Sequence, residues 1–394
     1  MLKKVLATLL SVSMIAASLA GCGSASSSEA APAESSKETT ESSAAEESQA
    51  EEGTAEADYS AVKVGMILGV TIDDGGFTQA QYMGVCDAFE ALGMSVEDQL
   101  VYVELVAADN VAVSSAAEEL MGEGCNVLIS ASTSFAPIVE ELAPQYPDVQ
   151  FCQVGVPMEN CLTYHYRAYE SMYAIGYMCA KMSETNELGY VGGMSEASVR
   201  FGINGFALGA RAANPDATVN VLWANSWYDP AVEGECAKTL IASGIKYIGT
   251  GTSSAGAPQA AEAEGAYTTC FDLDHKDFAP KSVLASFVFD WSPIFKQIIE
   301  GYVEHGMTPY VDNYFWGAAQ GCSKIAFNDD LVDADTQAEI QGVLDKIASG
   351  EIEVYGGELK NNEGEVLVEA GKSMDDAAIL NQEFLVENVI GTWK

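Results

Sequence analysis

The chain has 394 residues, with 58 acidic against 18 basic side chains and a formal net charge of −40. Such a composition argues against nucleic acid as a partner, because no basic patch exists to neutralise phosphates. About 335 residues remain after an unusual amino-terminal stretch, too many for one ordinary core and suited to two lobes.

The first residues predict an export signal. Lys3 and Lys4 precede a mainly apolar run, Val5 to Leu19, that is too short to span a membrane comfortably. The run ends at Leu19-Ala20-Gly21-Cys22, which resembles a bacterial lipobox. The resemblance implies a signal peptide over residues 1–21 and lipidation of Cys22, which would anchor the protein on the extracytoplasmic face of the membrane. The alternative is an ordinary secretory signal beside an incidental cysteine.

Residues 22–58 predict a disordered tether. From Gly23 to Asp58 the sequence is mostly Ser, Ala, Glu and Thr, with ten acids against the single base Lys37. Almost no large apolar side chain is available to offset the entropy of ordering, and like charges extend a chain. An acidic binding tail is the alternative interpretation.

From Tyr59 onward, strand-like apolar runs alternate with helical patterns. The predicted strands are Val62–Val70, Val101–Val106, Asn126–Ser130, Val149–Val154, Gly189–Gly192, Thr218–Trp223, Ile245–Gly249 and Ala266–Asp272. The predicted helices between them are Phe77–Leu92, Val111–Gly122, Phe135–Leu142, Ser198–Ala213, Pro230–Ser243 and Ala257–Glu264. This alternation predicts an α/β protein with parallel sheets covered by helices, whose ligands bind beyond the carboxyl ends of the strands.

Eight cysteines remain after Cys22, and they favour free buried thiols. They are Cys86, Cys125, Cys152, Cys161, Cys179, Cys236, Cys270 and Cys322. No two form a Cys-x-x-Cys pair and the chain has three histidines, so a zinc site is poorly supported and no cofactor is expected. A disulfide framework is the alternative.

Several motifs carry a resemblance to a known family. They are Asp73–Gln79 (DDGGFTQ), Tyr190–Met194 (YVGGM), Arg200–Phe206 (RFGINGF) and Trp223–Pro230 (WANSWYDP). Together they resemble the basic membrane protein family, lipoproteins related to the purine-nucleoside receptors of ABC transporters. The resemblance covers nearly all of Val62 to Lys394.

The resemblance implies a type I periplasmic-binding fold, in which two doubly wound lobes are joined by three crossovers and the ligand lies between them. Lobe 1 would span residues 59–165 with a returning segment near 290–320. Lobe 2 would span residues 166–289 with part of 321–394. A protein of this family would deliver its ligand, a purine base or nucleoside, to a membrane permease.

The resemblance also implies binding residues. Phe77 and Trp227 occupy the family's two stacking positions for a planar ligand, and each is otherwise an ordinary core ring. Asp272 matches an acid that accepts ribose hydroxyls in nucleoside receptors; otherwise it is a strand-end turn residue. The remaining candidates are polar or aromatic residues that follow strands, with helix capping or hinge packing as the alternative: Thr78, Gln79, Thr133, Ser134, Phe135, Thr252, Ser253 and Trp291.

Two departures bear on the ligand. Nucleoside receptors of the family carry a lysine where this chain has Val288-Phe289-Asp290-Trp291, which favours a free base. Adenine-type relatives have an acid near Ser253 that is absent here. Near the first crossover, Arg167 and Glu170 are expected to form a structural ion pair rather than a ligand clamp.

Catalysis is not expected. The sequence lacks a Gly-x-Ser-x-Gly elbow, a phosphate-binding Gly-Lys-Ser/Thr loop and a histidine pair. A sugar receptor is the main rival, although sugar pockets usually contain more Asp, Asn and Arg than these candidates supply. A sensor that reports its ligand to a membrane partner is the third possibility.

Overall fold

The computed structural model describes residues 57–393. The predicted signal peptide, Cys22 and all but the end of the predicted tether lie outside the described residues. Within the described range, no helix combines the length and the apolar character that crossing a membrane requires.

The first sheet has six parallel strands in the order β11-β5-β4-β3-β1-β2. Their bounds are β1 Val64–Ile67, β2 Leu100–Val103, β3 Val127–Ser130, β4 Gln150–Val154, β5 Leu162–Tyr166 and β11 Asn313–Trp316. β1, β3, β4 and β5 are buried at every residue, as expected for parallel strands covered on both faces.

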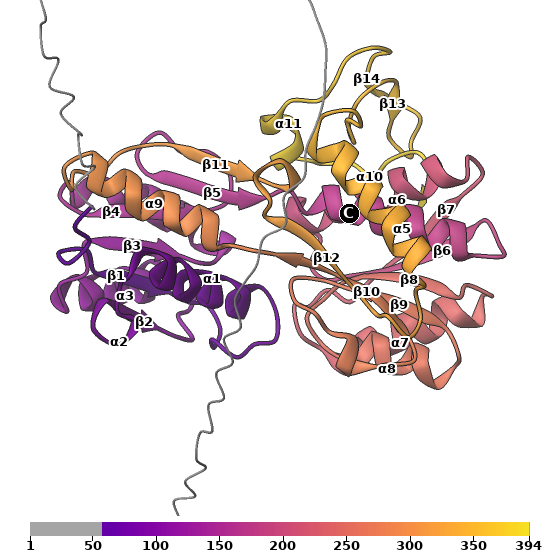
Figure 1. The fold of residues 1–394 in the computed structure, drawn as a ribbon, viewed down its shortest axis with the longest axis horizontal. Coiled ribbons are helices and arrows are strands. Elements are labelled where there is room, and N and C mark those ends of the chain that lie inside the picture. Colours follow the sequence, from indigo (N-terminus) through magenta and orange to yellow (C-terminus); the bar gives the residue numbers. More distant parts are fainter. Residues whose placement is uncertain (1–56, 394) are drawn as a thin grey trace, which may run out of the picture. The chain divides into compact units, whose positions relative to one another are not determined.

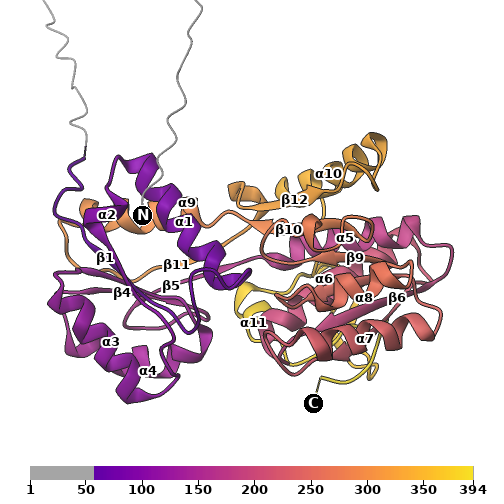
Figure 2. The same ribbon diagram turned by 90° about the horizontal axis from the view of Figure 1, so that it is seen from below.

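Helices cover both faces of this sheet. They are α1 Phe77–Leu92, α2 Val96–Gln99, α3 Asn110–Gly122, α4 Ala136–Leu142 and α9 Ser292–Glu304, with 3₁₀ turns η1 Thr133–Phe135 and η2 Ala143–Gln145. Figure 2 shows α1 and α9 on one face and α3 and α4 on the other.

The second sheet has seven strands in the order β12-β10-β9-β8-β6-β7-β15, and among its pairs only β10–β12 is antiparallel. The strands are β6 Glu187–Gly192, β7 Thr218–Trp223, β8 Tyr247–Gly251, β9 Tyr267–Cys270, β10 Val283–Phe289, β12 Ser323–Phe327 and β15 Val389–Ile390. Its helices are α5 Ala168–Met182, α6 Ala197–Ala213, α7 Pro230–Ala242, α8 Gly256–Ala263, α10 Ala334–Ala348 and α11 Asp376–Leu380, with turns η3 Lys276–Phe278 and η4 Ala318–Gln320. A separate small sheet pairs β13 Leu359–Lys360 with β14 Val366–Val368.

The chain passes between the two sheets three times. The crossings connect β5 to α5, β10 to α9, and β11 to β12. Consequently α9 and β11, drawn in orange, lie with the amino-terminal elements of the first sheet in Figure 1. We call the first sheet with its helices lobe 1 and the second sheet with its helices lobe 2. The α/β fold class predicted from the sequence is confirmed.

Arg167 connects two of these crossings, and it does so differently from the prediction. Its Nε donates to the Phe315 carbonyl at 2.7 Å, and its guanidinium pairs with Asp376 of α11 at 2.6 Å. Glu170 instead accepts a hydrogen bond from the backbone N–H of Ala318 at 2.6 Å. The predicted Arg167–Glu170 ion pair is therefore not formed, because each side chain has a partner on a returning segment far away in sequence.

All eight described cysteines are free thiols, and six of them are buried. Burial raises the pKa of the Cys161 and Cys179 thiols to about 12, so the nucleophilic thiolate is scarce near neutral pH.

Helices α5 and α6 pack closely through glycines. A Cβ atom added to Gly209 of α6 would collide with the Tyr173 carbonyl of α5, and one on Gly205 would collide with the Tyr169 carbonyl. Gly342 of α10 offers a contrast, since nothing lies within 4 Å of the position that a Cβ atom would take there.

We expect Gly209→Ala to lower the free energy of unfolding by about 1–3 kcal/mol, because backbone atoms of α5 would have to move. Gly342→Ala should raise it by up to about 1 kcal/mol, since alanine is the better helix former and meets no neighbour. Urea unfolding of both variants checks this. Equal effects of the two substitutions would contradict the close packing of α5 and α6.

Candidate functional site

A cavity of about 740 Å³ lies where strands of both sheets end. Lobe 1 contributes the segments that follow β1, β2 and β3, and lobe 2 contributes those that follow β7, β8 and β9. This is the edge at which parallel sheets place their ligand sites. The volume suits a small organic molecule.

Most of the predicted binding residues line this cavity. They are Phe77, Thr78, Thr133, Ser134, Phe135, Trp227, Thr252, Ser253 and Asp272. The family resemblance indicated these positions, and each lies between the end of a strand and the first turn of the helix that follows, where ligand sites of parallel sheets occur.

Gln79 and Trp291 do not line it, which corrects two predictions. The Gln79 side chain turns back and accepts a hydrogen bond from the Gly75 N–H at 3.0 Å. Trp291 is only 1% exposed and packs edge-on behind Phe77, with ring centroids 5.6 Å apart. Trp291 therefore supports a lining ring and belongs to the core.

The closed end of the cavity is formed by aromatic rings around Tyr166, the last residue of β5. Tyr166 is buried, and its ring lies 5.6 Å from Phe77 of lobe 1 and 6.2 Å from Phe271 of lobe 2. Behind it, Phe289 and Trp291 of the second crossing lie 5.5 and 5.3 Å away. Rings from both lobes thus meet at one buried tyrosine on the first crossing.

The open end is also aromatic but exposed. Trp227 and Tyr228, which follow β7, are 45% and 62% exposed although both line the cavity. Phe77 is half-buried by comparison. The two predicted stacking rings therefore differ in environment: one is held in place by packing, and the other is free to adjust to a guest.

The lining acid Asp74 of lobe 1 is already bonded within its own lobe. Asp74 accepts hydrogen bonds from the backbone N–H groups of Gly76 and Gln79, at 3.0 and 2.9 Å, and from Thr78 at 3.3 Å. Asp74 thereby caps the start of α1, a role that the sequence pattern had suggested for Thr78 and Gln79.

Polar atoms of lobe 2 are buried without partners. Asp272 Oδ1, the Tyr190 hydroxyl and Thr252 Oγ1 all lack a hydrogen bond, and all three residues line the cavity. Buried polar groups are normally bonded, so these three unpaired atoms in lining residues are the first candidates for bonds to a ligand.

Asp272 has the most perturbed carboxyl group in the described chain. Burial, with a smaller contribution from the charge of Asp74, raises the pKa of Asp272 to about 8. The residue follows β9 with a left-handed backbone (φ 71°), which turns it out of the strand that was predicted to include it.

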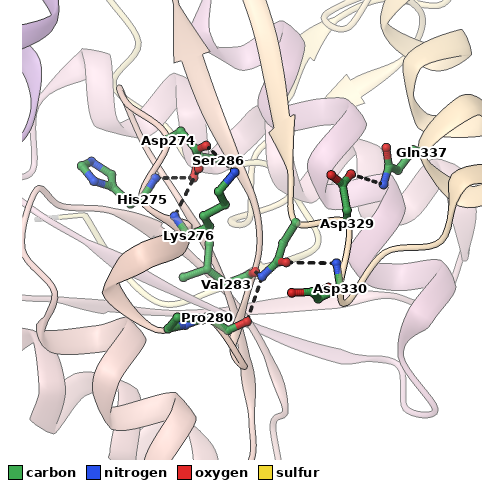
Figure 3. A network of polar contacts seen from close by, with 10 residues as sticks. Asp274, His275, Lys276, Pro280, Val283, Ser286, Asp329, Asp330 and Gln337 are labelled. Carbon is green, nitrogen blue, oxygen red and sulfur yellow. Dashed lines mark hydrogen bonds and ion pairs between the residues drawn. The ribbon is translucent and has the colours of Figure 1, made fainter. Parts of the chain in front are cut away.

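The neighbouring acid does not share this environment. Asp274 is exposed and pairs with Lys276 at 3.4 Å, and its turn is fixed to β10 by a hydrogen bond from the His275 N–H to Ser286 Oγ (Figure 3). In residues 57–393, no group of three or more His, Cys, Asp or Glu side chains could hold a metal ion.

The two lobes touch across the cavity. Thr133 Oγ1 of lobe 1 donates to Glu196 Oε2 of lobe 2 at 3.2 Å, and a Cβ atom on Gly76 would collide with Ser253 Oγ. Loops of the two lobes are therefore in contact beside the cavity.

Sequence reasoning missed several lining residues. Tyr190, Tyr228 and the acid Asp74 lie inside motifs that carried the family resemblance but were given no role. Phe271 precedes the predicted Asp272 directly after β9 and was likewise given no role, whereas Tyr166 and His165, at the end of β5, had no local signal.

Comparison with solved structures shows the same architecture. An ABC transporter solute-binding protein of Conexibacter woesei superposes with a TM-score of 0.61 at 20% identity, covering 74% of this chain and 98% of that one. A transcriptional activator of the comK gene from Bacillus halodurans gives 0.63 at 18% identity, covering 74% and 99%. At these identities the likeness concerns the fold alone.

A closer relative is the purine-binding protein of Brucella abortus, 31% identical over 338 residues, covering 83% of this chain and 93% of the relative. A putative ABC transporter glucose-binding protein of Haloferax volcanii is 26% identical, covering 68% and 70%. Basic membrane protein A of Borreliella burgdorferi is 24% identical, covering 74% and 86%.

Two lobes, three crossings and a cavity between the sheet ends define a protein with the fold of periplasmic binding proteins. The profile of the family described as ABC transporter substrate-binding protein, PnrA-like, matches residues 61–358, so the chain belongs to this family. The family resemblance inferred from the sequence motifs is confirmed.

The raised pKa of Asp272 gives a pH prediction for the ligand-free protein. A carboxyl with a folded pKa of about 8 and an ordinary value of 3.8 binds more protons when folded, so its contribution to stability is lost as pH rises between these values. We expect Asp272→Asn to remove this loss, because the amide does not ionise.

The measurement is thermal unfolding of both proteins from pH 5 to pH 8. The variant should gain stability relative to the wild type as pH rises. Taking the difference between the two proteins at each pH cancels the contributions of the other titrating groups, which both proteins share. A pH-independent difference would contradict the assigned environment of Asp272.

Proposed function

We propose that this protein captures a purine base or nucleoside outside the cell and passes it, unchanged, to the permease of an ABC transporter. The observation that carries the proposal is the buried carboxyl group of Asp272, whose Oδ1 atom has no hydrogen-bond partner, in a cavity lined by aromatic rings. A purine is a planar ring system with N–H groups at its edge. Its faces can stack on the aromatic rings, and an edge N–H group can donate a hydrogen bond to Asp272.

Aromatic rings support this ligand class. Stacking of a base on an aromatic side chain is worth about 1–3 kcal/mol. Phe77 is available in lobe 1 and Trp227 in lobe 2, so a planar guest between them would hold the lobes closed. The similarity to the Brucella purine-binding protein, which spans most of both chains, supports the same class.

A sugar is the second candidate, and the similarity to the Haloferax putative glucose-binding protein is the observation that favours it. Sugars also stack on aromatic rings, but their several hydroxyl groups need many polar partners. Among the described residues, the lining contains no Asn, Gln, Arg or Lys side chain, which favours the purine.

The proposal includes anchoring. Lipid attached to Cys22 would hold the protein at the outer surface of the membrane, and the acidic segment up to Asp58 would give the lobes reach toward the permease.

Purines should raise the melting temperature of the protein lacking residues 1–22, because a ligand that binds only the folded form stabilises it by about 2.7 kcal/mol at a hundredfold excess over Kd. The assay is a thermal-shift screen of purine bases, nucleosides, sugars and amino acids. Stabilisation by a sugar with none by any purine would reject the proposed ligand class.

Trp227→Ala should weaken purine binding at least tenfold through loss of one stacking surface. Tyr102→Ala is the control, since this partly exposed ring of β2 lies outside the cavity lining. Calorimetric titration of both variants with the purine found in the screen gives the comparison. Unchanged affinity in Trp227→Ala would remove this ring from the site.

Cys22→Ser should release the full-length protein from the membrane fraction, because the lipidated sulfur would be lost. Fractionation of cells that express both forms measures this, with Cys86→Ser as the control because Cys86 lies in α1 of the folded part. Equal membrane association of all three proteins would contradict lipid anchoring at Cys22.

A further inference from the structure

The charged side chains that line the cavity have one sign. Asp73 and Asp74 line it from lobe 1, and Asp272 lines it from lobe 2. Among the described residues that form the lining there is no lysine and no arginine. Glu196 adds a further acid at the contact between the lobes, bonded to Thr133. A guest that carries a phosphate or carboxylate would meet only negative charge here.

Among the acids that line the cavity, Asp272 is the one whose buried carboxyl group lacks a compensating partner at Oδ1. It is 6% exposed, and its Oδ1 atom has no hydrogen-bond partner. An isolated carboxylate is costly to bury, and the cost is removed either by a proton or by a cation at short range. Since the described lining supplies no basic side chain, Asp272 either keeps a proton or pairs with a cation that the guest brings.

The surrounding rings favour the same kind of guest. Phe77, Tyr166 and Phe271 lie close to the buried end, and Trp227 and Tyr228 lie at the open end. The faces of aromatic rings attract cations, and the attraction grows when water is excluded. A cavity that combines aromatic rings with unpaired acid resembles, in its chemistry, the sites that proteins use for organic cations.

We propose that the site prefers purines that carry a positive charge, namely bases or nucleosides alkylated on a ring nitrogen, over neutral purines of the same size. This inference rests on the proposed function, because it refines the ligand class of the same cavity. Asp272 is the specificity-determining residue: its carboxylate pairs with the charged ring, while the aromatic residues hold either form. Neutral purines bind the same site more weakly, because Asp272 then keeps a proton or an uncompensated charge.

The test compares two isomers that differ in charge and not in composition. 1-Methyladenosine is a cation near neutral pH, whereas N6-methyladenosine is neutral; 1-methyladenine and N6-methyladenine form the matching pair of free bases. Calorimetric titrations at pH 7 should give at least tenfold tighter binding of the cationic member in whichever pair binds. Equal affinities, or tighter binding of the neutral isomer, would overturn the inference and leave the proposed function standing.

Two variants test whether Asp272 causes the preference for cationic purines. Asp272→Asn should reduce the ratio of the two affinities to near one, chiefly by weakening the cation. Asp277→Asn is the matched control, because this exposed acid lies five residues further on, outside the lining, and its loss changes the net charge equally. A preference that survives in Asp272→Asn would overturn the role of Asp272.

A pH series on the wild type separates the charge of the guest from that of the protein. The groups that face Asp272 are Asp74 from lobe 1, Tyr166 from the first crossing and Tyr190 from β6, and His275 lies three residues further along the chain. Affinity for the cationic isomer should fall between pH 7 and pH 5, as Asp272 is held protonated, while affinity for the neutral isomer should change less. Parallel pH profiles would overturn the inference. Absence of binding by any purine would instead refute the proposed function itself.

Discussion

The packing of aromatic rings around Tyr166 is the constraint on which the rest of the site depends. Tyr166 ends a strand of lobe 1, begins the first crossing, and contacts rings of both lobes. Because the second crossing places Trp291 against the same ring, the sheets are held with their strand ends toward one cavity. The residues that follow those strands then face a common space. Ring packing at the crossings thereby sets where a guest can bind.

The two lobes make different chemical contributions to this space. In lobe 1, Asp74 is occupied in capping α1, and the lobe offers the ring of Phe77 together with polar side chains such as Asp73 and Ser134. In lobe 2, Asp272, Tyr190 and Thr252 keep unpaired polar atoms. A guest with a planar body and a polar edge is therefore satisfied only when both lobes contact it. This division predicts that ligand binding is coupled to closure of the lobes, since residues of both lobes line the cavity.

Membership of the family does not by itself set the ligand. Relatives named for purine and for glucose binding both resemble this chain over most of its length, and the two-lobe fold accommodates either. The features that discriminate between ligands are a small number of side chains at strand ends. In this protein the absence of basic residues from the described lining and the burial of Asp272 are more specific than the aromatic rings, because rings stack with many planar or apolar guests.

The sequence by itself determined the fold class and the family, and with the family resemblance it identified nine of the residues that line the cavity. Alternating strands and helices are local patterns, and a residue such as Asp272 in the turn after a strand lies at the ligand-binding edge of a parallel sheet. Tertiary structure decided what those patterns leave open. It placed Trp291 behind Phe77 rather than in the lining, and it paired Arg167 with Asp376 instead of Glu170. It also made Asp272 a buried acid without a partner at Oδ1. Burial and pairing depend on which distant segments meet, and a local pattern contains no information about those contacts.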